Sequence, residues 1–293
     1  MRVSNQMIYN NLADYLQQNN DALLVPEQQI ASGQNINLPS DDPLAFAKVV
    51  NLNDVTGKLN QYLNNQNDAL SYMNATNNAL DQASKVIADI IKTADNAESG
   101  QTPQTQQYNS LMVTNDFQAL VDAANTTYQG QYLFAGFKSN AAAYNNSGVY
   151  QGDSGQIMIQ VAPGVSSQRN LVGQDVFGTA SGGVDIFAAI QNLQTAVSTN
   201  NLAGIQSALV SLNAGQQQVL SNQGMLAERM VSVQTNQTYV KGLSSTTSHL
   251  LGGIQSVDMN LAITQLNQQA TALQAVQAMS AKVMNLSIVN FLK

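Results

Sequence analysis

Apolar residues recur at intervals of three and four positions through the final stretch of the chain, Asp258 to Lys293. These intervals place them on one face of an α-helix. The opposite face carries amides and hydroxyls, and after Asp258 only Lys282 and Lys293 are ionisable. Because an isolated helix gains most of its stability by burying its apolar face, this helix needs a partner. The stripe consists of Met259, Ile263, Leu266, Ala270, Leu273, Val276, Met279, Val283 and Leu286.

A looser stripe of the same kind runs through residues 3–24, again on an amide-rich background with few charges. Pro26 interrupts it, since a proline inside a helix removes a backbone hydrogen bond and clashes with the preceding turn. We therefore expect a kink or a new helix start at Pro26, a helical turn to Ala31 and an end at Gly33. The stripe contains Val3, Met7, Ile8, Leu12, Tyr15, Leu16, Ala22 and Leu23.

A much longer helix is predicted to follow. It starts at Ser40-Asp41-Asp42-Pro43, because an aspartate accepts hydrogen bonds from the free backbone N–H groups and proline has a helical φ angle. From Leu52 to Ala94 the core positions alternate by three and four, as in a coiled coil of roughly 60 Å. Gln66 and Thr76 fall within this seam, where polar residues can fix the register.

Further helices follow, and the last of them mirrors the first long helix. A turn at 99–103 leads into a helix over 104–128, and the short connection predicts antiparallel neighbours. Asp185 begins another helix. From Leu202 to Val240 a second heptad pattern appears, stays in phase to Ile254 and is expected to end at Gly252-Gly253.

The stretch between these helices has a different character. Residues 130–137 are aromatic and bounded by glycines, as in a strand. Val149-Tyr150 and Ile157–Val161 flank Gly152-Asp153-Ser154-Gly155, which predicts a β-hairpin.

The sequence therefore predicts a mainly α fold: a long antiparallel helical bundle or coiled coil built from both halves of the chain, with a small β-rich insert domain in the middle. We expect terminal assembly helices at 1–40 and 256–293. The long bundle should comprise 41–129 and 184–255, and the β-rich outer insert 130–183.

Composition narrows the function. The 293 residues are 44% hydrophobic but only 10% charged, against roughly 25% charged in ordinary domains. Such a surface favours association. The net charge of -7 argues against nucleic-acid binding, and the absence of Cys excludes disulfides and thiol chemistry. No secretory signal or run of 18 apolar residues is present, so no membrane insertion is expected, and any export leaves the N-terminus intact.

Catalytic chemistry finds little support. Asp41 and Asp42 could form an acid–base pair or bind a metal, but a helix start explains them fully. His249 has no second His, Cys or Glu-x-x-His partner in the sequence. No phosphate loop, nucleophile elbow or zinc spacing occurs. We expect no enzyme activity, catalytic residue, cofactor or metal.

Five blocks of the sequence are distinctive: Met1-Arg2-Val3-Ser4, Gln29 to Ile36, Pro39 to Pro43, Gly130 to Gly136 and Ser287 to Leu292. Together they resemble the flagellin superfamily, and within it the subunits that join hook to filament. Flagellin proper has an Asp-Asp-Ala-Ala-Gly type of block where this chain has Ser40-Asp41-Asp42-Pro43. The match covers roughly residues 1–138 and 205–293 and leaves the middle unmatched.

The resemblance implies a noncatalytic structural adaptor of the extracellular bacterial flagellum, exported unfolded through the flagellar type III apparatus. Its implied partners are further copies of itself in a ring or helix, a second junction protein, flagellin, and a cytosolic export chaperone that binds the C-terminal region. The terminal stripes would then form the assembly interface. Its members are Val3, Met7, Ile8, Leu12, Leu16, Met259, Ile263, Leu266, Leu273, Val276, Val283, Leu286 and Phe291.

Two alternatives remain open. A flagellin-type filament subunit would be abundant and would polymerise alone into long filaments. A helical-hairpin binding module, such as a receptor sensor or a phage structural protein, would have a membrane anchor or a folded N-terminus, and the sequence indicates neither.

Overall fold

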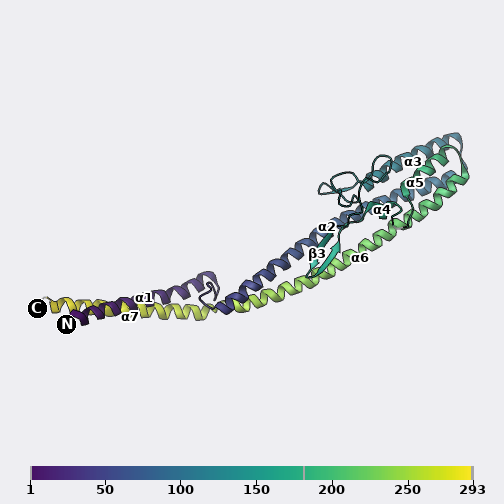
Figure 1. Ribbon diagram of the computed structural model, residues 1–293. Coiled ribbons are helices and arrows are strands. Elements are labelled where there is room, and N and C mark those ends of the chain that lie inside the picture. The colour runs from purple at the N-terminus through teal and green to yellow at the C-terminus, as the bar shows by residue number, and fades with distance from the viewer. Residues whose placement is uncertain (1, 181, 292–293) are drawn as a thin grey trace. The chain divides into compact units, whose positions relative to one another are not determined.

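The computed structural model describes the backbone of residues 2–180 and 182–291, and it describes side chains except those of residues 1–5, 8, 9, 181 and 283–293. Long helices dominate, and the four strands form two separate two-stranded hairpins (Figure 1). The prediction of a mainly α fold with a small β-containing middle is confirmed. The elements are α1 Arg2–Ser32, α2 Pro43–Glu98, α3 Pro103–Ala124, β1 Thr127–Tyr128, β2 Gln131–Tyr132, β3 Met158–Ala162, β4 Val165–Gln168, α4 Gly173–Phe177, α5 Ile186–Ser198, α6 Leu202–Gln255 and α7 Met259–Phe291.

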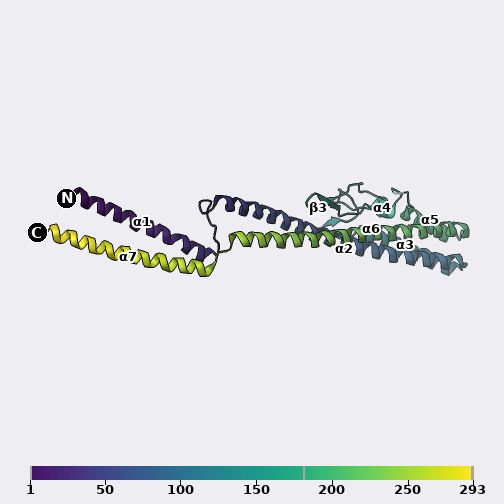
Figure 2. The ribbon, with the colours of Figure 1, turned by 90° about the horizontal axis from the view of Figure 1, so that it is seen from below.

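The chain divides into two compact units, each containing segments from both halves of the sequence. Unit 1 comprises residues 1–58 and 243–293, and unit 2 comprises 59–242. In unit 1, α1 and α7 lie side by side and run in opposite directions (Figures 1 and 2). Helices α2 and α6 contribute residues to both units. The first and last helices therefore pair with each other, as the two matching stripes predict.

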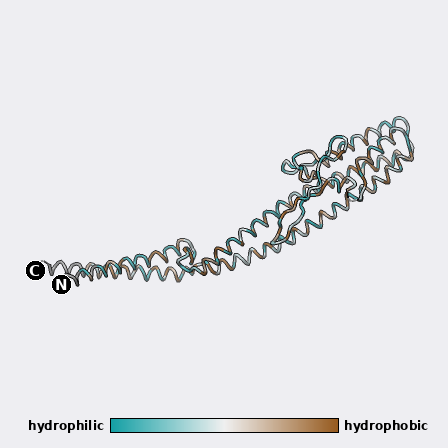
Figure 3. Tube along the Cα trace, in the orientation of Figure 1, coloured by the Kyte–Doolittle hydropathy of each residue, from teal (hydrophilic) through white to brown (hydrophobic). Residues whose placement is uncertain are grey.

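In unit 2 the long helices α2 and α6 are antiparallel, and side-chain amides fix their register. Gln237 donates to Asn67 Oδ1 at 2.7 Å, and Gln223 donates to Asp81 Oδ1 at 2.6 Å. Along both helices apolar and polar residues alternate (Figure 3). Such alternation is expected of helices that bury one face only.

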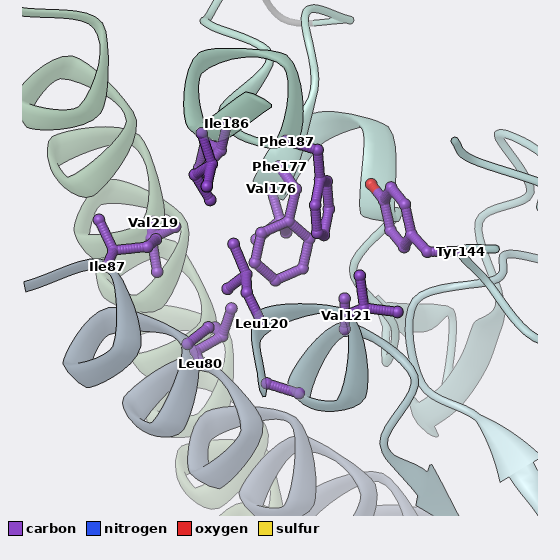
Figure 4. Close-up of a cluster of buried hydrophobic side chains, with 14 of the residues drawn as sticks. Leu80, Ile87, Leu120, Val121, Tyr144, Val176, Phe177, Ile186, Phe187 and Val219 are labelled. Carbon is purple, nitrogen blue, oxygen red and sulfur yellow. The ribbon is translucent and has the colours of Figure 1, made fainter. Parts of the chain in front are cut away.

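The core of unit 2 lies where α2, α3, α5 and α6 meet. Leu80 from α2, Leu120 from α3 and Val219 from α6 are fully buried there. Their side chains point toward one another and toward Phe177 and Ile186 (Figure 4). Leu120 thus packs in a cluster whose members come from elements far apart in the sequence. All members of this cluster belong to unit 2.

The middle of the chain contains few strands, and asparagine side chains form hydrogen bonds with backbone groups that a neighbouring strand would otherwise pair. Asn125 donates to the Tyr144 carbonyl at 2.8 Å and accepts from the Tyr144 N–H at 2.9 Å. The fully buried Asn170 accepts from the Ile157 N–H at 2.7 Å and donates to the Gly155 carbonyl at 2.9 Å. Each amide satisfies both a donor and an acceptor of irregular backbone, as a strand partner would.

Side chains of both long helices, α2 and α6, contact this middle part of the chain. From α2, Asp68 pairs with Arg169 at 2.6 Å, and the Arg169 guanidinium lies 4.9 Å from the centre of the Tyr72 ring. From α6, Gln218 accepts from the Val184 N–H at 2.8 Å and donates to the Gly178 carbonyl at 2.8 Å. The seam residue Gln66 donates to the Val161 carbonyl of β3 rather than to another helix.

The turn from Tyr132 to Gly136 is a structural element of this core. Leu133 and Phe134 are fully buried, and the Leu133 carbonyl accepts from the Tyr72 hydroxyl at 3.0 Å. Gly136 has φ +69, and a Cβ atom there would lie 2.2 Å from Asp153 Oδ1. Only glycine fits this position without displacing Asp153.

The structure corrects three local expectations. The hairpin pairs β3 with β4 across Pro163 and Gly164, not Val149-Tyr150 with Ile157–Val161. Proline followed by a glycine at φ +72 suits a tight two-residue turn. Within Gly152–Gly155, Asp153 instead accepts from the Phe137 N–H at 2.7 Å and the Gly155 N–H at 2.9 Å, which makes a loop and not a hairpin.

The other two corrections concern helix ends. Helix α1 continues through Pro26 to Ser32, so no new helix starts at the proline. Helix α6 continues past Gly252-Gly253 to Gln255. The propensity cost of a glycine in a helix is about 1 kcal/mol, which tertiary packing can outweigh.

Asp116 on α3 provides a pH-dependent test of this fold. Burial, and secondly the charge of Asp89 on α2, raise the pKa of Asp116 above its ordinary value of 3.8, and its buried Oδ2 has no hydrogen-bond partner among the described residues. A raised folded-state pKa stabilises the fold below the unfolded pKa, and this contribution is lost as pH rises through the folded pKa.

Asp116→Asn is therefore expected to raise the free energy of unfolding at neutral pH, by less than about 1 kcal/mol because solvent partly screens the site, and thermal unfolding measures the change. The difference from the unaltered chain should vanish below about pH 4. The exposed Asp122, on the same helix, supplies the control variant Asp122→Asn. An Asp116→Asn chain that is less stable at neutral pH would contradict the interpretation.

Candidate assembly surface

The surface between α1 and α7 is a narrow seam of small and medium-sized residues. On α7 the residues turned toward α1 are spaced by three and four, and Ala262 is only 2% exposed. Small residues allow two helices to approach closely, as do the alternating positions of a coiled coil. The buried or half-buried positions of α7 with this spacing are Ala262, Leu266, Gln269, Leu273, Val276 and Ser280.

Larger apolar side chains flank this seam and stay exposed. At about 100° per residue, Met259 and Ile263 lie on one side of the seam, and Leu261 and Met279 lie on the other. Ile263 is 46% exposed and Leu261 is 56% exposed. Helix α1 likewise leaves Met7, Tyr15, Leu24 and Val25 exposed. We call these eight residues the flanking surface.

The sequence-predicted interface residues divide between seam and flank. Leu266, Leu273 and Val276 are half-buried in the seam, and Leu12 and Leu16 are half-buried on α1. Met7, Met259 and Ile263 belong to the flanking surface. The side chains of Val3, Ile8, Val283, Leu286 and Phe291 lie outside the described part of the structure. Sequence reasoning missed Ala262 and Ser280, because it searched for large apolar residues. Their heptad spacing is the signal that could have found them.

The α7 part of the flanking surface carries almost no charge, whereas α1 has the exposed residues Asp14, Asp21 and Glu27. In the described part of α7, Lys282 is the one ionisable side chain, and the remaining polar residues are amides and hydroxyls. Exposed apolar residues that are gathered on one structure, without charges between them, mark sites of protein association. Without charges, contact with another subunit buries apolar area without desolvating ions.

Two backbone hydrogen bonds join the residues that follow α1 to those that precede α7. The Asn35 N–H donates to the Gln255 carbonyl at 2.7 Å, and the Val257 N–H donates to the Gly33 carbonyl at 3.2 Å. Asp258 then caps α7, accepting from the backbone N–H groups of Asn260 at 3.0 Å and Leu261 at 3.2 Å.

The Ser40–Pro43 block caps the next helix. Asp42 Oδ1 accepts from the N–H groups of Leu44 at 3.0 Å and Ala45 at 2.9 Å, and α2 begins at Pro43. Asp41 Oδ2 accepts from the N–H groups of Leu38 at 2.8 Å and Asn37 at 2.9 Å. These two bonds lower the pKa of Asp41 below its ordinary value of 3.8. Both carboxylates thus serve the backbone.

Other kinds of site find no support in the part of the chain that the structure describes. There, no group of three or more His, Asp and Glu side chains is placed to hold a metal ion. None of the described helices has the length and apolar character needed to span a bilayer. His249 is exposed on α6.

The sequence and the fold are similar to those of known proteins. Residues 3–139 match the family model described as the bacterial flagellin N-terminal helical region. Flagellar hook-associated protein 3 of Salmonella typhimurium is 23% identical over 301 residues, and the alignment covers 94% of each chain. Flagellin B of Helicobacter pylori is 31% identical over 139 residues, which is 45% of this chain and 27% of that protein.

The fold has solved counterparts as well. A structure of a putative flagellar hook-associated protein from Vibrio parahaemolyticus superposes with a TM-score of 0.66 at 21% identity, over 74% of this chain and 100% of that one. Flagellin B is matched over 27% of its length, whereas the hook-associated protein is matched nearly end to end. These matches are to members of the flagellin superfamily, and the match that spans this chain almost end to end is to a hook-associated protein 3.

Proposed function

We propose that this chain is a noncatalytic structural subunit that joins the flagellar hook to the flagellin filament outside the cell. The observation that supports this most is the near end-to-end match to a hook-associated protein 3, which covers 94% of both chains. The fold suits the role, because the apolar and nearly uncharged exposed side of α7 can bind neighbouring subunits, and such binding needs no catalytic site.

We further propose which segments do what. Residues 1–40 and 256–293 would form the inner assembly helices, 41–129 and 184–255 the supporting bundle, and 130–183 the outer insert. The flanking surface would contact further copies of this chain, the other junction protein and the first flagellin subunits. Before export, a cytosolic chaperone would cover the C-terminal region, because α7 exposes apolar side chains that are unstable in water alone.

A strain lacking this gene tests the function. Electron microscopy should show complete hooks without filaments, and flagellin should accumulate in the medium because nothing retains it on the hook. A plasmid copy of the gene should restore the filaments. Filaments of normal number and length in the deletion strain would refute the proposal.

Sedimentation of the purified chain separates this role from that of a filament subunit. A junction subunit is needed in few copies and should not sediment as long filaments when the purified chain is concentrated. A filament subunit should do so. Long filaments formed by the purified chain alone would favour the flagellin alternative.

A further inference from the structure

A cavity of about 190 Å³ lies between the insert and the start of α5, and both aromatic and polar residues line it. Tyr144, Tyr150, Phe177 and Phe187 all line it. The Tyr144 ring centre lies 4.7 Å from that of Phe187 and 5.2 Å from that of Tyr150 (Figure 4 shows Tyr144, Phe177 and Phe187). The volume exceeds the ~10–15 Å³ that one water needs, but it is below the ~300–1,000 Å³ of pockets for whole drug-sized ligands. The cavity is therefore of a size for the end of one side chain.

One wall residue carries an unsatisfied polar atom. Tyr144 is only 3% exposed, yet its hydroxyl oxygen has no hydrogen-bond partner among the described residues. The neighbouring Tyr150 hydroxyl, in contrast, lies 2.9 Å from the Phe134 carbonyl and 2.8 Å from the Asp153 carbonyl. Buried hydroxyls are normally paired, so the Tyr144 hydroxyl marks a place where a hydrogen-bond partner is missing.

The electrostatic environment of the cavity favours a cation. Asp185 lines it, and Oδ1 of Asp185 accepts from the Ala188 N–H at 3.0 Å. Burial raises the pKa of Tyr144, and the charges of Tyr150, Asp185 and Asp175 raise it further. The lining residues include no Lys or Arg. The Asp185 carboxylate would repel an anion, and a neutral donor would gain a hydrogen bond from it but not the attraction between opposite charges.

We propose that this cavity binds the guanidinium group of an arginine side chain presented by a neighbouring flagellar subunit. A guanidinium stacks on aromatic rings, bonds to carboxylates and is weakly hydrated, so it loses less on entering than an ammonium does. One of its N–H groups would also donate a hydrogen bond to the Tyr144 oxygen, which otherwise has no partner among the described residues. That the arginine comes from another subunit rests on the proposed function, whereas the preference for a guanidinium rests on the cavity alone.

Titration of the full chain with ethylguanidinium tests the preference. The chain is labelled with ¹³C-tyrosine, and the Tyr144 resonance is identified by its loss in Tyr144→Phe. At millimolar concentrations, far below those that unfold proteins, ethylguanidinium should shift this resonance saturably. The neutral analogue ethylurea should not. A short peptide with a central arginine and blocked ends should bind at least as well as ethylguanidinium.

Asp185→Asn is the decisive variant. Asparagine caps a helix as well as aspartate does, so α5 should keep its start while the cavity loses a charge. The dissociation constant for ethylguanidinium should rise at least fivefold. The control Asp95→Asn, an equal change of charge on the exposed side of α2, should alter it less than twofold.

Equal shifts with ethylurea, or unchanged binding in Asp185→Asn, would refute the guanidinium site. Binding of ethylguanidinium but not of the arginine peptide would refute its assignment to a side chain. Neither result touches the junction role, which the deletion strain tests separately. If the deletion strain keeps its filaments while the peptide binds, the site stands and its assignment to a flagellar neighbour falls.

Discussion

A chain that ends at Val257 is expected to fold its unit 2 and to support no filament growth. Residues 258–293 contribute all of α7, so their removal leaves the facing side of α1 without a partner. No residue of the unit 2 core comes from this segment. The truncated gene, introduced into the deletion strain, should give hooks without filaments in electron micrographs, while the purified chain keeps the helical circular dichroism of unit 2.

A point substitution refines this test. Leu273→Asp places a charge in the α1–α7 seam, where water cannot solvate it fully, and should also prevent filament growth. Gln277→Asp makes the same charge on an exposed position one turn later, and filaments should form. Filaments of normal length on the truncated chain, or equal effects of the two aspartates, would show that the seam is not needed for assembly.

Leu120→Ala is expected to destabilise unit 2 by about 2–5 kcal/mol. The Leu120 side chain is fully buried among residues of several elements, so its loss leaves a cavity that the packed helices cannot close. Because whole domains are stable by only about 5–15 kcal/mol, this is a large fraction of the total. Urea unfolding can be followed by the near-ultraviolet circular dichroism of tyrosine, since the chain has no Trp.

Leu111→Ala is the matched control, because it removes the same atoms from the same helix. Leu111 is 59% exposed, and its loss should cost less than about 1 kcal/mol. Equal losses in the two variants would mean that α3 does not bury the face assigned to it.

The helices could be predicted from the sequence because their signals are long and repeated. The heptad pattern of α2 extends over many turns, and Asp42-Pro43 marks its start by local chemistry alone. The pairing of α1 with α7 followed from two matching stripes, neither of which is stable alone. In these elements, local preference and burial require the same structure.

The insert could not be predicted in detail, because long-range contacts determine it. Asp153 can begin a hairpin turn or cap a loop, and the choice depends on Phe137, which lies 16 residues away. Pro163-Gly164 is a usable turn signal in the sequence, but Gly152-Asp153-Ser154-Gly155 is a competing one, and local chemistry does not decide between them. The cavity beside Tyr144 is assembled from three separate segments, so no spacing in the sequence reveals it.

The amide cross-links of unit 2 have a consequence for the environment in which a flagellum works. Arg169 and Asp68 form an ion pair there, whereas Gln218, Gln237, Asn125 and Asn170 join distant segments by neutral hydrogen bonds. Ions in the medium weaken contacts between exposed charges but leave neutral hydrogen bonds nearly unchanged. A joint built in this way keeps the same internal strength in fresh water and in brine.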